Sequence, residues 1–295
     1  MRILHIDSGT EMRGGQWQVL RLVEGLRARG HESVLLARDG APLFKEAQRR
    51  GIEVHAVNLL SVRRSSRGAD VTHAHDARSH TTAVMVAPVR LVVSRRVAFA
   101  VQRNLVSHWK YTRAAHYIAV SDFVRKTLLA AGIAPSRISI VYDGVPMLPV
   151  SQGSEIVVPE SQDPRKGMRL ALAGMKQAGL SPLISHDLEK DLARAGMFVY
   201  ITESEGLGSA VLLAMAAGVP VIASNVGGIP EIVENERTGL LIENSPEAIA
   251  SAVRRLHDDR ALAQSLAAEA RRTVEQRFSI ERMVTDTIAV YEALA

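Results

Sequence analysis

Residues 198–233 read FVYITESEGLGSAVLLAMAAGVPVIASNVGGIPEIV, and this stretch decides the fold class. Residues 198–201 are apolar and rich in β-favouring side chains, which predicts a buried strand. Residues 209–217 are apolar almost all round, which predicts a helix buried on every side, and Gly218 is placed to end it. A second strand begins at 219–223. Because the joints are short, the pattern predicts a βαβ unit and therefore a parallel sheet.

The loops at the carboxyl ends of these two strands suit an anionic ligand. The sequence EGLG at 205–208 precedes the first helix, and GG at 227–228 precedes a second helix that we expect to begin with Pro-Glu at 230–231. Ligands of parallel sheets bind beyond the carboxyl ends of the strands. Backbone N–H groups at a helix N-terminus attract phosphate, and glycine allows close approach to the backbone. Each glycine pair also fits a plain tight turn.

The composition is that of an ordinary globular protein. The chain has 295 residues, of which 47% are hydrophobic and 23% charged, enough for two domains or one large one. It has no cysteine, which excludes disulfides and cysteine nucleophiles and fits a reducing compartment. The N-terminal MRILHID has the character of a strand rather than of a signal peptide. No apolar run approaches the roughly 20 residues of a membrane span.

Positive charge is concentrated in the first half of the chain. Residues 1–148 contain 22 Lys and Arg against 11 Asp and Glu, whereas the remainder contains 14 against 20. A basic half can face nucleic acid, an anionic membrane surface or an acidic substrate, or it can reflect solvated arginine-rich surfaces. The stretch 97–113 is basic and includes Trp109. It fits a membrane-facing segment or, as we prefer, a core-packed Trp109 among solvated charges.

The first half opens with a Rossmann-like pattern. A strand at 2–7, an amphipathic helix from 14 to 29 and a strand at 31–37 follow one another. Between 60 and 70 the chain is polar and arginine-rich, and we expect no helix there, although a doubly wound domain would place one.

A Pro- and Ser-rich linker at 146–153 predicts two domains, 1–148 and 149–295. From 180 to 191 the chain is short for the unit expected there, so about one β–α unit is predicted to be missing. The predicted C-terminal helices are 246–258, 260–276 and 280–293.

Several motifs together resemble the family-four retaining glycosyltransferases. They are GGQWQVLRLVEGLRARGHE at 14–32, DVTHAH at 70–75, IAVSDFVRKTLLAAGI at 118–133, Lys166-Gly167, and the run from EGLG at 205 through GGIPEIV to TGLL at 238–241. The resemblance implies an α/β fold of the GT-B type, with two Rossmann-like domains whose parallel sheets face a central cleft. Both domains are expected to be abbreviated, and the final helix 280–293 to return to the first domain.

The resemblance also implies a donor site in the second domain. Glu205 matches the first glutamate of the family's E-x₇-E motif and is the expected catalytic residue at the donor sugar. The second glutamate, which binds the nucleotide ribose in the family, falls on Leu213, which cannot accept a hydrogen bond. Lys166 is expected at the donor diphosphate; the companion arginine falls on Ser161, and Arg165 is the candidate substitute. The expected donor-binding residues are Gly206, Leu207, Gly208, Lys166, Arg165, Gly227, Gly228 and Glu231.

In the first domain the resemblance places six residues on the cleft: Gly14, Gly15, His73, His75, Arg95 and Arg96. His73 and His75 lie two apart on a strand and point to one face, which invites a metal site. No second group of ligands is visible, so we expect polar cleft lining and no metal. Arg95 and Arg96 follow a strand where many relatives carry a histidine. They can hold an anionic acceptor or a phosphate, or simply be exposed.

Three functions remain open at this point. The favoured one is a retaining, metal-independent glycosyltransferase of cell-envelope biosynthesis, acting on a glycolipid such as lipopolysaccharide or on a polysaccharide. The others are a weakened or non-catalytic relative that serves as a binding or partner-dependent subunit, and a sugar-nucleotide epimerase on the same fold. The expected partners are a nucleotide sugar and a glycan or glycolipid acceptor, with no cofactor and no nucleic acid. We expect a cytoplasmic protein; contact with the inner membrane face and self-association stay open.

Overall fold

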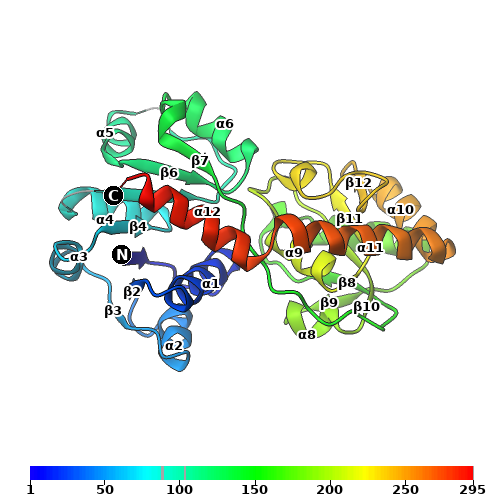
Figure 1. The fold of residues 1–295 in the computed structure, drawn as a ribbon. Helices are drawn as coiled ribbons and strands as arrows, with labels where there is room; N and C mark the ends of the chain where they lie inside the picture. The colour runs from blue at the N-terminus through cyan, green and yellow to red at the C-terminus, as the bar shows by residue number, and fades with distance from the viewer. Residues whose placement is uncertain (88–89, 103, 295) are drawn as a thin grey trace. The chain divides into compact units, whose positions relative to one another are not determined.

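The computed structural model describes residues 1–87, 90–102 and 104–294, which divide into two compact units. Unit 1 combines Met1–Gly144 with Ile280–Ala295, and unit 2 is Val145–Ser279. Each unit is a parallel sheet flanked by helices (Figure 1). The predicted α/β fold with two parallel sheets is confirmed. The division falls after Gly144, whereas the linker predicted it after residue 148.

Unit 1 is built on a seven-stranded parallel sheet in the order β3-β2-β1-β4-β5-β6-β7. Strands β1 and β2 each have one exposed residue followed by five buried ones, as expected for a sheet covered on both faces. The order reverses between β1 and β4, which is where doubly wound sheets bind ligands. The strands are β1 (Arg2–Asp7), β2 (Glu32–Ala37), β3 (Val54–Ala56), β4 (Val71–Ala74), β5 (Leu91–Arg95), β6 (His116–Ala119) and β7 (Ile138–Ile140).

The helices of unit 1 include one from the C-terminal end of the chain. They are α1 (Gly14–Ala28), α2 (Pro42–Arg49), α3 (Leu59–Ser66), α4 (Ala77–Val86), α5 (Leu105–Arg113), α6 (Asp122–Ala130), the 3₁₀ turn η1 (Pro135–Arg137) and α12 (Ile280–Glu292). Helix α12 packs on α1 so closely that a Cβ on Gly25 would lie 2.4 Å from Val284 Cγ2. Tyr291 is completely buried in the same cluster. The last helix is therefore an integral part of the core of unit 1.

Helix α3 contradicts the expectation that no helix lies between residues 60 and 70. Asn58 caps it: its side chain accepts from Ser61 N–H, and Ser61 Oγ accepts from Asn58 N–H, each at 2.9 Å. Val62 is completely buried, although its neighbours are polar. One capping box and one anchored apolar side chain are enough for two turns, and neither produces a visible apolar period.

Unit 2 has a five-stranded parallel sheet in the order β12-β11-β10-β8-β9. The strands are β8 (Glu155–Pro159), β9 (Leu183–Ser185), β10 (Ala195–Tyr200), β11 (Val221–Ser224) and β12 (Leu240–Ile242). The helices are α7 (Met168–Ala178), α8 (Leu188–Leu192), α9 (Ser209–Ala216), α10 (Pro246–Asp258) and α11 (Arg260–Arg277), with the 3₁₀ turns η2 (Pro164–Lys166) and η3 (Ile229–Glu231). The predicted βαβ unit is confirmed, because β10 pairs in parallel with β11 and α9 connects them.

Between α7 and β10 the chain forms one short β–α unit, and the expectation that about one such unit is missing there stays a prediction. Strand β9 and helix α8 occupy residues 183–192, and β9 pairs with β8 at the edge of the sheet. Both are short, with three and five residues, so neither shows a clear period in the sequence. Within the described part of the chain, no helix is both long enough and apolar enough to cross a bilayer.

Candidate functional site

In unit 2 the loop after β10 brings three polar side chains together. The Glu205 carboxylate accepts at Oε2 from Lys166 Nζ, at 2.6 Å, and from the Tyr200 hydroxyl, at 2.5 Å. Its Oε1 accepts from the backbone N–H of Gly206 at 3.0 Å. The carboxylate is thus held by groups from β10, from the loop that follows β10, and from η2.

The surroundings of Tyr200 keep its hydroxyl protonated, so that it can donate a hydrogen bond. The side chains of the Lys166–Glu205 ion pair are 35% and 18% exposed. Burial, and then the charge of Glu205, raises the pKa of Tyr200 well above its usual value. Its hydroxyl therefore stays protonated and donates to the carboxylate. Motif comparison missed Tyr200; its only signal is a hydroxyl-bearing side chain at the carboxyl end of an apolar strand.

The two adjacent cations that were predicted for the donor differ in placement. Lys166 reaches the carboxylate, whereas Arg165 is exposed and its guanidinium pairs with Asp163 at 2.7 Å. Gly167 follows Lys166 at φ 61°, and a Cβ there would lie 2.6 Å from Ile201 Cγ2. Only glycine suits this position. The turn places Lys166 within reach of Glu205, which follows β10.

Helix α9 begins at Ser209 next to the same loop, with no side chain capping it. Its N-cap is Gly208, at φ 109°, and the first turn of the helix contains no acidic residue. The positive end of the helix dipole is therefore available to an anionic group. Leu207 is 2% exposed, so its side chain belongs to the core and a ligand can meet only its backbone.

Gly227 and Gly228 pack against the Glu205 loop. Gly228 N–H donates to the Glu205 carbonyl oxygen at 3.0 Å. A Cβ on Gly227 would lie 2.0 Å from that oxygen, and one on Gly228 would lie 2.1 Å from the Gly206 carbonyl oxygen. The contact between two loops therefore requires both glycines, where we expected close approach by a ligand. The helix predicted to begin at Pro230 is wrong: Ile229–Glu231 is a three-residue 3₁₀ turn.

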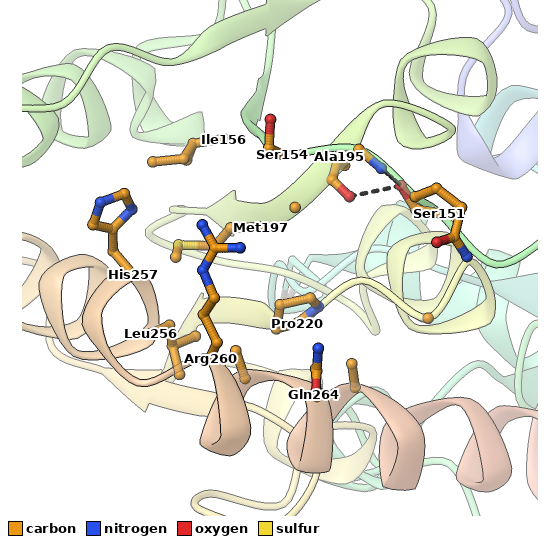
Figure 2. Close-up of a pocket in the computed structure, with 16 residues that line it drawn as sticks. Ser151, Ser154, Ile156, Ala195, Met197, Pro220, Leu256, His257, Arg260 and Gln264 are labelled. Carbon is orange, nitrogen blue, oxygen red and sulfur yellow. Dashed lines mark hydrogen bonds between the residues drawn. The ribbon is translucent and has the colours of Figure 1, made fainter.

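A cavity of about 450 Å³ in unit 2 lies away from this site (Figure 2). Its lining includes Ser154, Ala195 and Pro220, at the amino ends of β8, β10 and β11, together with Arg260 of α11. Glu205 follows the carboxyl end of β10. The cavity therefore lies at the amino ends of the strands, and the Glu205 cluster lies at their carboxyl ends.

In unit 1, Arg96 follows β5, at the carboxyl ends of the strands. Its Nε donates to Asp143 at 3.2 Å, and its Nη1 is buried with no hydrogen-bond partner among the described residues. A Cβ on Gly15, near the start of α1, would lie 3.8 Å from Arg96 Cδ, whereas Gly14 is exposed. Asp7 at the end of β1 is buried, and burial, followed by the charge of a second aspartate, raises its pKa.

Arg95 has a different role from Arg96. Its guanidinium donates to the Tyr111 hydroxyl at 2.7 Å and to the Phe99 carbonyl oxygen, so it ties β5 to α5. Trp109 of α5, which we expected in the core, is 39% exposed, and the Arg113 guanidinium carbon lies 4.8 Å from its ring centroid. That expectation is wrong, because α5 has no buried residue.

His73 and His75 are 1% and 6% exposed, so neither offers the open polar surface that we expected. His73 contacts the Tyr291 hydroxyl at 2.6 Å and Ser94 Oγ at 2.8 Å. His75 Nε2 lies 3.0 Å from Nδ1 of His5, a residue that the sequence did not single out. Burial lowers the pKa of all three histidines, that of His5 to about 3, so the rings are neutral near pH 7.

Comparison with known proteins follows the division into two units. The profile described as "Glycosyl transferases group 1" matches residues 166–273, and the one described as "Glycosyltransferase Family 4" matches residues 12–147. N-acetyl-alpha-D-glucosaminyl L-malate synthase of Bacillus anthracis is 34% identical over 34% of this chain and 26% of its own length. D-inositol 3-phosphate glycosyltransferase of Streptomyces avermitilis is 32% identical over 50% of this chain and 32% of its own length. The chain thus spans about a third or less of these curated relatives.

Among solved structures, the chain is similar to HepE of Anabaena in complex with UDP and glucose. The TM-score is 0.87, with 15% identity and 100% of each chain covered, and at this identity the likeness concerns the fold. Two parallel-sheet units of this kind agree with the GT-B fold. The chain belongs to the family-four glycosyltransferases, with the family-four profile in unit 1 and the group 1 profile in unit 2.

Proposed function

We propose that the protein is a retaining glycosyltransferase that moves a sugar from a nucleotide-sugar donor to a cell-envelope glycolipid or polysaccharide. The observation that carries the proposal is the cluster of Lys166, Tyr200 and Glu205 beside the uncapped start of α9. Sugar transfer needs positive charge at the leaving diphosphate and a fixed polar contact to the sugar. In this proposal Lys166 and α9 meet the diphosphate, and Glu205 meets the sugar.

In this proposal, Lys166 and Glu205 change partners when the donor binds. Without a ligand, Lys166 neutralises Glu205. A bound diphosphate competes for the ammonium group of Lys166, and Tyr200 then remains as the side-chain partner that holds Glu205 in place. All the charge stabilisation in this scheme comes from the chain itself. HepE, which has the same fold, binds UDP and glucose, and this supports a nucleotide sugar as donor.

We assign the acceptor to unit 1, at Arg96. Its buried Nη1 lacks a partner among the described residues, and a hydroxyl, phosphate or carboxylate oxygen of an acceptor would supply one. Gly15 places no side chain against Arg96, and a Cβ there would lie at an ordinary contact distance, 3.8 Å, from Arg96 Cδ. The neighbouring Arg95 also has a buried nitrogen, Nε, without a partner among the described residues, but its other two nitrogens donate to Tyr111 and Phe99, so it is not part of this assignment.

The exposed face of α5 supports contact of unit 1 with the cytoplasmic face of the inner membrane. Leu105 and Val106 are 88% and 71% exposed, and Arg113 lies on the same short helix. Exposed apolar side chains beside cations bind anionic lipid surfaces. A glycolipid acceptor would be found at that surface. Vesicle flotation with Leu105→Ser, compared with wild type, tests this contact.

A donor screen tests the proposed function. We expect one nucleotide sugar to raise the melting temperature, and transfer with retained anomeric configuration, followed by NMR, when an acceptor is added. Lys166→Gln should remove the thermal shift, whereas Lys176→Gln, which changes an exposed lysine of α7, should not. Binding without transfer would favour a binding subunit, which the leucine at 213 also fits. Interconversion of the donor alone would favour an epimerase.

A further inference from the structure

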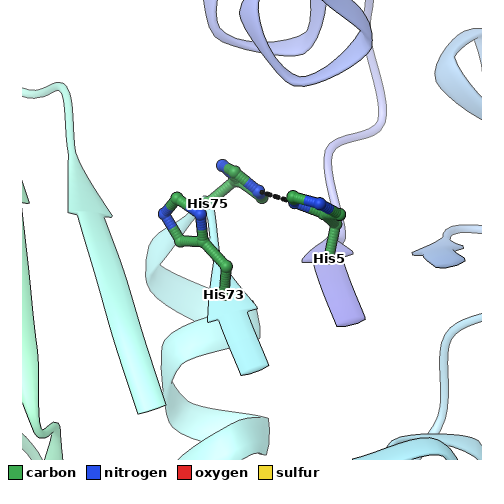
Figure 3. A group of neighbouring side chains, drawn as sticks. All are labelled: His5, His73 and His75. Atoms are coloured by element: carbon green, nitrogen blue, oxygen red, sulfur yellow. Dashed lines mark hydrogen bonds between the residues drawn. The ribbon is translucent and has the colours of Figure 1, made fainter. Parts of the chain in front are cut away.

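Three imidazoles of unit 1 lie close together, two on neighbouring strands and one on the residue that follows the second strand (Figure 3). His5 of β1 lies opposite His73 of β4 in the sheet register, and His75 follows β4. One nitrogen from each ring can be chosen so that all three lie within 4.8 Å of one another. The ring centroids are 3.9 Å apart for His73–His75, 5.3 Å for His5–His75 and 5.9 Å for His5–His73.

The hydrogen bonds of the described residues do not satisfy these rings. His5 is completely buried and His75 is 6% exposed, yet His5 Nε2 and His75 Nδ1 have no partner among the residues that the structure describes. Buried polar nitrogens in proteins are nearly always paired. Two of them in one cluster of three imidazoles show that the hydrogen bonds of the described residues leave the cluster incomplete; they are the ring nitrogens not used in the 3.0 Å contact between His5 and His75.

We propose that His5, His73 and His75 bind one transition-metal ion of the Zn²⁺ class. Zinc–imidazole bonds of about 2.0–2.1 Å place the nitrogens of a tetrahedral site about 3.3 Å apart. His5 Nδ1 and His75 Nε2 are 3.0 Å apart, and one nitrogen of each of the three rings can be chosen so that all three lie within 4.8 Å of one another. Imidazole ligands without a carboxylate favour zinc, cobalt, nickel or copper over magnesium or calcium.

The surroundings of His73 fit the second shell of such a site. Its two nitrogens contact the hydroxyls of Tyr291 and Ser94. On binding the ion, His73 exchanges one of these contacts for the metal, and the remaining hydroxyl fixes the orientation of its ring. Because Tyr291 belongs to α12, the ion would link β1 and β4 to the C-terminal helix of unit 1. The site is buried, so its role is to stabilise unit 1, separate from the sugar chemistry proposed for unit 2.

The test is the metal content of the full chain, without an affinity tag, after refolding with Zn²⁺ or Co²⁺ and desalting. Refolding is needed because a buried site fills as the chain folds. We expect one ion per chain by mass spectrometry, and visible absorption of the Co²⁺ form typical of tetrahedral coordination. His5→Gln and His75→Gln should lose the ion and the absorption. His55→Gln and His186→Gln, which change exposed histidines paired with Glu53 and Glu160, should keep both.

A second measurement covers variants that fail to fold. In the wild-type protein, a chelator should lower the thermal stability of unit 1, which hydrogen exchange measures. Donor binding by unit 2 should stay unchanged. Wild-type protein that refolds without a stoichiometric ion would overturn the proposal, as would binding lost only in the His55 or His186 variants. The trio would then be a metal-free hydrogen-bonded cluster.

Discussion

At the scale of single residues, the proposed chemistry depends on the Glu205 carboxylate, which accepts three hydrogen bonds. Both Glu205 oxygens accept hydrogen bonds, one of them from a cation and a buried phenol. Such fixed groups contribute to catalysis because they need not reorganise as charge develops. Substitution of Glu205 or of Tyr200 therefore tests the chemistry separately from the folding of unit 2.

Glu205→Gln keeps the size of the side chain and removes its charge. We expect turnover to fall by about 10²–10³-fold, the usual effect of losing one contact at a reacting centre, with little change in melting temperature. Steady-state transfer assays and thermal unfolding measure the two effects. Glu203→Gln changes an exposed glutamate close by and is the matched control. Unchanged transfer by Glu205→Gln, with the donor still bound, would remove the chemistry from this site.

Tyr200→Phe removes the hydroxyl that donates to Glu205 at 2.5 Å and leaves the packing of the ring intact. A hydrogen bond to a charged group contributes about 1.5–3 kcal/mol, so we expect kcat to fall by about 10- to 100-fold and the donor KM to change less. Tyr117→Phe is the control, because that hydroxyl bonds the Tyr111 carbonyl oxygen in unit 1. Equal losses of kcat in both variants would show that the effect is one of stability alone.

At the scale of elements, α9 has two functions that limit what can be changed in it. Its N-terminus is the proposed phosphate site, and residues 211–216 are all buried, including Leu213 at 9% exposure. The family's second glutamate would stand at this leucine. A carboxylate there would lie mostly inside the packed helix, which contacts α11.

Leu213→Glu should therefore destabilise unit 2, by more than about 2 kcal/mol, because it buries an ionisable group without a partner. Leu213→Met conserves volume and should cost less than about 1.5 kcal/mol. Denaturant unfolding followed by a probe in unit 2 compares the two variants. A stable Leu213→Glu protein that binds a nucleotide more tightly than wild type would contradict this prediction and would show that the ribose contact can be restored.

At the scale of the whole molecule, the two units differ in how the chain builds them. Unit 2 is one continuous segment, whereas unit 1 needs α12 from the far end of the chain. Met283, Val284 and Tyr291 of α12 are buried in the same cluster as Ile3 and Leu22. Without α12 that apolar surface faces water, which costs about 25 cal/mol per Å².

We therefore expect residues 145–279 to fold alone, as judged by dispersed NMR signals and cooperative unfolding. Residues 1–144 alone should be unstable, and addition of a peptide spanning 280–295 should restore their cooperative unfolding. A fragment 1–144 that unfolds cooperatively without the peptide would contradict the assignment of α12 to the core of unit 1.

The sequence by itself determined the parts that local patterns encode. The apolar runs and glycine stops of residues 198–223 define β10, α9 and β11, and the amphipathic periods of α10, α11 and α12 agree with their predicted ranges within a residue or so. These signals extend over a few turns, so neighbouring residues carry them. The carboxylate of the candidate site followed from motif order alone.

Tertiary structure decided the rest, because the relevant contacts join residues far apart in the chain. Helix α3 forms because the side chain of Val62 is buried in the folded unit. The polar residues beside it in the sequence do not indicate this burial. Gly227 is required by a carbonyl group of another loop, so its role is packing. His5 and His75, 70 residues apart, meet only because β1 and β4 are adjacent in the sheet. Contacts of this kind leave no periodic trace in the sequence, since each depends on how distant segments pack.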